Sequence, residues 1–313
     1  MFEAKGLDVA LAMFFLIYLF ASLLVLQTWK FFAGWIQHKS ARQQANGLFA
    51  LRVFPFVLAV IFTFGVTLPS FILLEPRNIR ESVGIAPLIL GLCCLVLIAW
   101  GIIHTVAAQR RTAQTISAWL SGASRLKSTG DDSVPIFQTG HDSPTLTVAG
   151  ISAPKVLVSE AAIASLNEKE LHRALRHEIA HVRSYDNFKK LTFRFLMFPG
   201  MRPLERVWHE AAEMAADDAA VSNREEALDL ASALIKISRL ATGKVPEFTM
   251  GLLHSSTALS KRIQRLCTWT QPHPGSSDWF YLVPTGLAGM MCTAVIYHHM
   301  LVSVHRVTEW LVR

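Results

Sequence analysis

The chain has 313 residues, of which 52% are hydrophobic and 17% are charged, and its formal net charge is +7. Soluble globular domains carry about 25% charged residues, so this composition argues against an ordinary soluble protein. The basic residues form no stripe interleaved with aromatics, and many flank apolar segments, where they would meet anionic lipid headgroups. We therefore expect a lipid bilayer, and not nucleic acid, as their partner.

Four uncharged apolar segments reach the roughly 20 residues that a membrane-spanning helix needs. Three lie in the first third of the chain, over about residues 9–29, 53–74 and 84–108, and the fourth covers about residues 279–304. The first is longer than the apolar core of a signal peptide and has neither its basic front end nor its cleavage site. The sequence thus predicts a multi-pass membrane protein with four spans.

Lysine and arginine residues are distributed unevenly between the ends of these spans. The segment between the first two spans carries Lys30, Lys39, Arg42 and Arg52. A second basic group follows the third span, whereas the N-terminus carries only Lys5. By the positive-inside rule, the N-terminus lies outside and the polar segment lies in the cytosol. We expect a membrane domain over residues 1–109, a cytosolic domain over 110–278, and the last span with a short extracytoplasmic tail over 279–313.

The cytosolic segment begins with a polar stretch, residues 110–133, that is typical of a helix leaving the membrane and then a loop. Short stretches rich in β-branched residues follow between Gly and Pro residues, over 134–139, 145–149 and 155–159. They predict a small sheet with exposed edges. We expect the second of them to be an edge strand, where Thr145 and Val148 could pair with an extended peptide.

The pattern then becomes helical from Asn167 to about Trp269. Asn167 can cap the first helix, with Glu170 three residues on as the partner in a capping box. Apolar residues spaced three and four apart give this helix a packing face, and His177, Glu178 and His181 share the adjacent face.

These three residues belong to an HExxH motif, His177-Glu178-Ile-Ala-His181. Spacing of four places both imidazoles one turn apart, so that both can bind one zinc ion at about 2.0–2.1 Å. Glu178 is placed to take a proton from an attacking water and to give it to the leaving amine. The alternative is a charged helix with two solvated histidines, but the cap and the packed opposite face favour the metal.

A catalytic zinc ion has three protein ligands, so the third is expected from another helix. The next helix begins near Pro203 and places Glu213 and Asp217 four apart among alanines, which let two helices approach closely. We predict Glu213 as the third ligand and Asp217 as the acceptor of an imidazole N–H. His209 and Glu210 are the competing candidates for the third ligand. The alternative to any metal ligand on this helix is an ordinary acidic helix face.

The segment after the HExxH helix, residues 188–199, is rich in aromatic residues and carries Lys189, Lys190 and Arg194. One interpretation places it in the membrane interface, close to the zinc. The other makes it a core helix of the cytosolic domain with a basic outer face. The sequence leaves both open.

Three stretches carry a resemblance to a known family: residues 153–187, HEAAEMAADDAAV over 209–221, and ALSKRIQRLCTW over 258–269. They resemble the BlaR/MecR-type antirepressor metallopeptidases, which are gluzincins, and more distantly the membrane zinc peptidases of the HtpX and CAAX-processing type. The resemblance implies one Zn²⁺ per chain held by His177, His181 and Glu213, with Glu178 as the acid and base. It implies supporting roles for Asp186 and Asp217. It also places Arg262 in a recurrent stretch, either reaching back to the site or pairing with an acid.

The fold class expected is a mainly α integral membrane protein: four transmembrane helices plus a cytosolic α+β gluzincin-like zinc peptidase domain with a small sheet. The resemblance implies an endopeptidase of a bacterial-type cytoplasmic (inner) membrane, cleaving a protein substrate such as a repressor at the cytosolic face. The β-lactam-sensing members carry an extracellular penicillin-binding domain after the last span, and we do not expect such a domain here. A sensor is then expected from a membrane partner or a homo-oligomer. An inactive scaffold or signal-transducing subunit and a quality-control protease are the alternatives.

Overall fold

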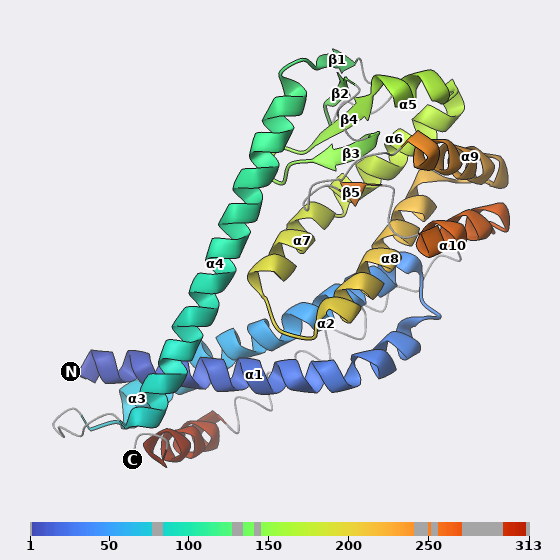
Figure 1. Ribbon diagram of the computed structural model, residues 1–313. Coiled ribbons are helices and arrows are strands. Elements are labelled where there is room, and N and C mark those ends of the chain that lie inside the picture. Colours follow the sequence, from blue (N-terminus) through green and yellow to red (C-terminus); the bar gives the residue numbers. More distant parts are fainter. Residues whose placement is uncertain are drawn as a thin grey trace.

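The computed structural model describes residues 2–76, 84–126, 134–140, 145–240, 250–251, 256–270 and 297–310. Long apolar helices form one part of the molecule, and a small sheet with shorter helices forms the other (Figure 1). In the described part, three helical segments are long and apolar enough to cross a membrane: Phe2–Ile36, Ala41–Leu74 and Ile85–Leu120. These contain the first three predicted spans.

The first two of these segments are joined by a short turn. Helix α1 spans Phe2–Ile36 and α2 spans Ala41–Phe62, and a capping box between Ser40 and Gln43 starts α2. A π-helical turn, η1 (Thr63–Thr67), and α3 (Leu68–Leu74) continue the second segment. Arg52, which the sequence placed in the link between two spans, therefore lies within α2, and it is only 1% exposed.

Helix α4 (Ile85–Leu120) connects the two parts of the molecule. It begins beside α1 and α3 and ends at the sheet (Figure 1). The helix predicted to leave the membrane after the third span is thus a direct continuation of that span. Where a loop was predicted after it, the chain forms a short strand, β1 (Ser124–Leu126).

The sheet has five strands in the order β1-β2-β4-β3-β5. The three predicted strands are present as β2 (Ile136–Thr139), β3 (Leu146–Ala149) and β4 (Lys155–Ser159). Strand β2 is parallel to β4, and the other neighbours are antiparallel. The sheet is therefore mixed, and both of its outermost strands are ones that the sequence did not predict.

The prediction that β3 is an edge strand is wrong. Strand β5 (Met250–Gly251) pairs with it at Thr147 and Val148. Val148 is buried, and the carbonyl of Thr145 accepts a hydrogen bond from the Ser159 amide at 3.0 Å. A peptide could add to β3 only by displacing β5.

In the described part of the chain, six helices lie between β4 and residue 270, and two hydrophobic cores hold them. They are α5 (Glu160–Ser165), α6 (Glu168–Arg183), α7 (Asp186–Phe195), α8 (Arg202–Ala220), α9 (Arg224–Leu240) and α10 (Ser256–Cys267). One core joins the sheet to α6 and α9, and includes Leu175, Ile179 and Leu234. The other joins α1 and α2 to α7 and α8 through residues such as Leu48, Phe193 and Trp208. The space between α6 and α8 lies where the two cores meet.

A last helix over residues 297–310 packs beside η1 and α3. The Tyr297 hydroxyl donates to the Gly65 carbonyl at 2.7 Å, and the Ser70 hydroxyl donates to the Leu301 carbonyl at 2.8 Å. Most of the predicted fourth span, residues 279–296, lies outside the described residues.

Candidate metal centre

Helix α6 forms as its local signals predict. The Asn167 side chain accepts from the Glu170 amide at 2.9 Å, and the Glu170 carboxylate accepts from the Asn167 amide at 2.9 Å. The apolar face packs into the first core, while His177, Glu178 and His181 are buried on the adjacent face. The HExxH residues thus point into the protein and not into solvent.

Helix α8 supplies the opposite side of the site. It begins at Arg202 with Pro203 in its first turn, where a missing N–H is tolerated. Its buried alanines allow a close approach to α6. They are Ala211, Ala212, Ala215, Ala216 and Ala220. This approach brings Glu213 and Asp217, both buried, against the two histidines.

The three predicted ligands converge on one point. His177 Nε2 lies 3.1 Å from His181 Nε2, and each lies 3.6 Å from one oxygen of Glu213. Four atoms placed tetrahedrally around zinc at about 2.05 Å lie about 3.3 Å from one another. The separations therefore fit ligand atoms around one zinc-sized ion, and among the described residues these side chains form a group able to hold a metal.

The other nitrogen of each ring faces a carboxylate. His177 Nδ1 lies 3.0 Å from Asp217 Oδ1, and His181 Nδ1 lies 2.8 Å from Asp186 Oδ2. Contacts of this kind fix the orientation of a ligating histidine and raise its basicity. Both Nε2 atoms are left to face the common point.

Asp186 reaches His181 because α6 and α7 are joined by one sharp turn. Tyr185 adopts φ 55° and ψ 35°, in the left-handed region that bulky residues rarely occupy. Helix α7 then begins at Asp186, whose second oxygen lies 3.3 Å from Lys189 Nζ. The backbone strain at Tyr185 thus coincides with the turn that aims Asp186 at the histidine.

Arg262 of α10 compensates the acidic side of the site. Its guanidinium donates to Asp217 at 2.6 and 2.8 Å and to Glu213 at 2.7 Å. Burial raises the pKa values of these two carboxyls, but the positive charge of Arg262 outweighs burial and holds both well below their usual range. The sequence left open whether Arg262 reaches back to the site or pairs with an acid. The structure shows that it does both.

Glu178 differs from Glu213 and Asp217 because Arg262 donates no hydrogen bond to it and acts on it only through its charge. Among the described residues, neither of its buried oxygens has a hydrogen-bond partner. Burial raises the pKa of Glu178 to about 7, although His177 and His181 act to lower it. A carboxyl with this pKa can accept and release a proton near neutral pH.

His177 is held in the charged form when no metal is present. Burial lowers its pKa, but Asp217 and Glu213 outweigh that effect and raise the pKa to about 9. A bound metal would replace this proton as the positive charge between the carboxylates. The donor set of two imidazoles and one carboxylate suits zinc.

The remaining predicted residues lie around this group. His209 Nε2 lies 4.0 Å from Glu213 Oε1, so His209 adjoins the group, while Glu210 is outside it. Val148 lies in β3 and Thr145 directly before it, and neither belongs to the group. Lys190, counted in the sequence only as part of a basic face, interacts electrostatically with Glu213, Asp186 and Glu178, and burial lowers its pKa to about 8. Its spacing of four from Asp186 is the signal that could have located it.

A second group, Glu75, His305 and Glu309, also brings potential ligands together. Lys5 Nζ already lies 2.5 Å from a Glu75 oxygen, and the Glu309 side chain is 48% exposed. This group thus resembles a surface charge cluster with its own cation.

An HExxH helix with a glutamate from a second helix is an arrangement typical of metallopeptidase sites. The chain belongs to the BlaR1 peptidase M56 family, whose model matches residues 83–266. A search of curated proteins finds no match. The match runs from the start of α4 into α10 and includes the whole metal centre. Together with the three apolar helices, it indicates a membrane-associated metallopeptidase.

Proposed function

We propose that the protein is an integral-membrane zinc endopeptidase that hydrolyses peptide bonds of a protein substrate at the cytosolic face of the membrane. The observation that carries this proposal is the convergence of His177 Nε2, His181 Nε2 and the Glu213 carboxylate, with Glu178 beside them. In the proposal His177, His181 and Glu213 hold the metal, and Asp217, Asp186 and Arg262 support them.

The chemistry divides between the metal and the chain. When bound, zinc polarises a peptide carbonyl and acidifies a water molecule. Glu178 takes a proton from the attacking water and delivers it to the leaving amine, and its pKa of about 7 suits both steps. Asp217 and Asp186 keep the two imidazoles in place, and Arg262 keeps Glu213 and Asp217 ionised. All these side chains are buried, which strengthens the electrostatic interactions among them.

The cellular setting is part of the same proposal. The basic residues near the spans support an inner-membrane protein with its N-terminus outside and its peptidase domain in the cytosol. The family supports regulated proteolysis of a repressor-like substrate, with the signal coming from a partner membrane protein or a second copy. A quality-control role would use the same site on damaged membrane proteins.

The test is substrate trapping with Glu178→Gln in cells. The variant should retain zinc and hold uncleaved substrate, whereas Glu210→Gln, on α8 but outside the metal group, should cleave as the wild type does. Identification of trapped proteins by mass spectrometry separates a single regulator from a mixture of membrane proteins. If Glu178→Gln cells keep the wild-type phenotype and no substrate is retained, the chain acts as a scaffold and the peptidase proposal is wrong.

A further inference from the structure

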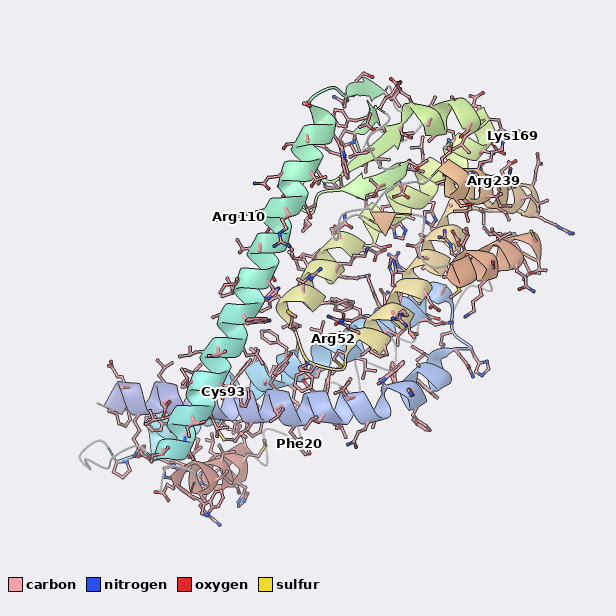
Figure 2. All side chains as sticks on the ribbon, viewed as in Figure 1. Phe20, Arg52, Cys93, Arg110, Lys169 and Arg239 are labelled. Atoms are coloured by element: carbon pink, nitrogen blue, oxygen red, sulfur yellow. The ribbon has the colours of Figure 1, made fainter. Side chains whose placement is uncertain are left out.

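A cavity of about 1260 Å³ lies between α4 and the connection from α7 to α8. One wall is the middle of the apolar part of α4, including Leu92, Val96 and Trp100. These side chains are 62%, 57% and 54% exposed, so the wall is open along the surface that would face lipid. Cys93, which also lines the cavity, marks its place in Figure 2, near the crossing of α4 and α1.

The opposite wall is basic. Lys190 and Arg194 line it from α7, and Arg202 and Arg206 line it from α8. The acidic side chain there, Glu205, is paired with Arg52, whose Nε lies 2.9 Å from the Glu205 carboxylate. Arg202 and Arg206 are exposed, and neither forms an ion pair within the described residues. The cavity thus has an excess of positive charge facing an apolar wall.

We infer that this cavity binds an anionic phospholipid, with its acyl chains along α4 and its phosphate between the basic residues of α7 and α8. Basic pockets between membrane helices bind anionic headgroups in this way. The volume exceeds the roughly 300–1,000 Å³ of pockets for small molecules, so a larger ligand fits better. A zwitterionic lipid would leave the positive charges of Arg202 and Arg206 uncompensated.

The lipid site adjoins the metal centre. His209 lines the cavity, and its Nε2 lies 4.0 Å from Glu213 Oε1. Lys190 also lines the cavity and interacts with Glu213. The bound lipid would therefore form the membrane-facing boundary of the metal centre along α8. An apolar peptide with acidic residues is the other ligand that these walls could accept, and its binding would argue against the lipid.

The inference is tested by native mass spectrometry of the full-length protein in detergent, with phosphatidylglycerol or phosphatidylcholine added. Wild type should retain phosphatidylglycerol in preference to phosphatidylcholine, and inorganic phosphate should not displace it. The double substitution Arg202→Gln and Arg206→Gln should weaken retention about 30-fold. The matched control is Arg110→Gln with Arg111→Gln, an exposed arginine pair on α4 outside the cavity.

A second variant addresses the apolar wall without changing the charge. Val96→Trp should fill the cavity and reduce phosphatidylglycerol retention, whereas Ile103→Trp, on an equally exposed part of α4 outside the cavity, should not. The inference is overturned if both lipids bind equally, if the control pair lowers retention as much as the cavity pair, or if inorganic phosphate displaces the lipid. Binding of an acidic apolar peptide in place of phosphatidylglycerol would also overturn it, in favour of a peptide site.

Discussion

Replacing Arg262 by Met removes the positive charge at the metal centre while keeping much of the aliphatic stem. The guanidinium makes two contacts with Asp217 and one with Glu213, all between 2.6 and 2.8 Å, and it is 6% exposed. Removing one partner of a buried ion pair leaves the other charge uncompensated, which costs about 3–5 kcal/mol. We expect that loss in the free energy of unfolding of the metal-free protein.

Arg265 provides the matched control, because it lies one turn further along α10 and pairs with Asp218, the neighbour of Asp217. Its side chain is 35% exposed, so Arg265→Met should cost at most about 1 kcal/mol. At about 2–4 °C per kcal/mol for a domain of this size, Tm should fall by about 6–20 °C for Arg262→Met and at most about 4 °C for the control.

The assay is thermal unfolding of metal-free protein in detergent, repeated across pH. Asp217 and Glu213 have ordinary pKa values of 3.8 and 4.5, and Arg262 lowers both in the folded protein. The stabilisation is therefore complete above these values and is lost as pH falls through the lower folded-state values. Equal Tm losses for the two variants, or a difference that persists undiminished at pH 2, would refute the role assigned to Arg262.

Three further predictions concern the metal, the helix contacts and the cap. The pKa of His177 is raised to about 9, so zinc must displace a proton from His177 below that pH. Zinc affinity should therefore rise about tenfold per pH unit from 6.5 to 8.5. A flat pH profile of zinc affinity in chelator competition would contradict this. Gly101→Ala would place a Cβ 2.4 Å from the Phe195 carbonyl oxygen and should lower Tm by forcing α4 away from α7. The control Gly34→Ala, whose Cβ would have nothing within 4 Å, should raise Tm or leave it unchanged. Equal effects of the two variants on Tm would show that α4 and α7 do not pack closely at Gly101. Asn167→Ala should lower the free energy of unfolding by about 0.5–2 kcal/mol through loss of the helix cap. Asn167→Asp keeps a capping oxygen and should be close to wild type. An aspartate variant as unstable as the alanine variant would argue against capping.

Features set by neighbouring residues could be predicted from the sequence. The cap, the packing face and the HExxH face of α6 all follow from residues within one or two turns of each other, and the structure has them as predicted. The position of Glu213 followed from spacing and from the alanines beside it. These signals are local, and a helix converts them directly into geometry.

Features set by distant partners could not be predicted. Arg52 is buried because it meets Glu205 and the Leu196 carbonyl, both more than a hundred residues away in the chain. Strand β5 consists of Met250 and Gly251, which carry no strand pattern of their own and pair only because β3 is nearby. Tyr185 occupies a conformation that its residue type disfavours, so no local rule would place a sharp turn there.

Zinc content of the detergent-purified protein tests the central claim most directly, measured for wild type, Glu213→Ala and Glu210→Ala. The two glutamates lie on the same helix, and Glu213 alone belongs to the metal group. We predict about one zinc ion per chain in wild type and Glu210→Ala, and a marked loss from Glu213→Ala. Absence of zinc from the wild type even when it is supplied would contradict the metal centre, and full retention by Glu213→Ala would contradict its third ligand.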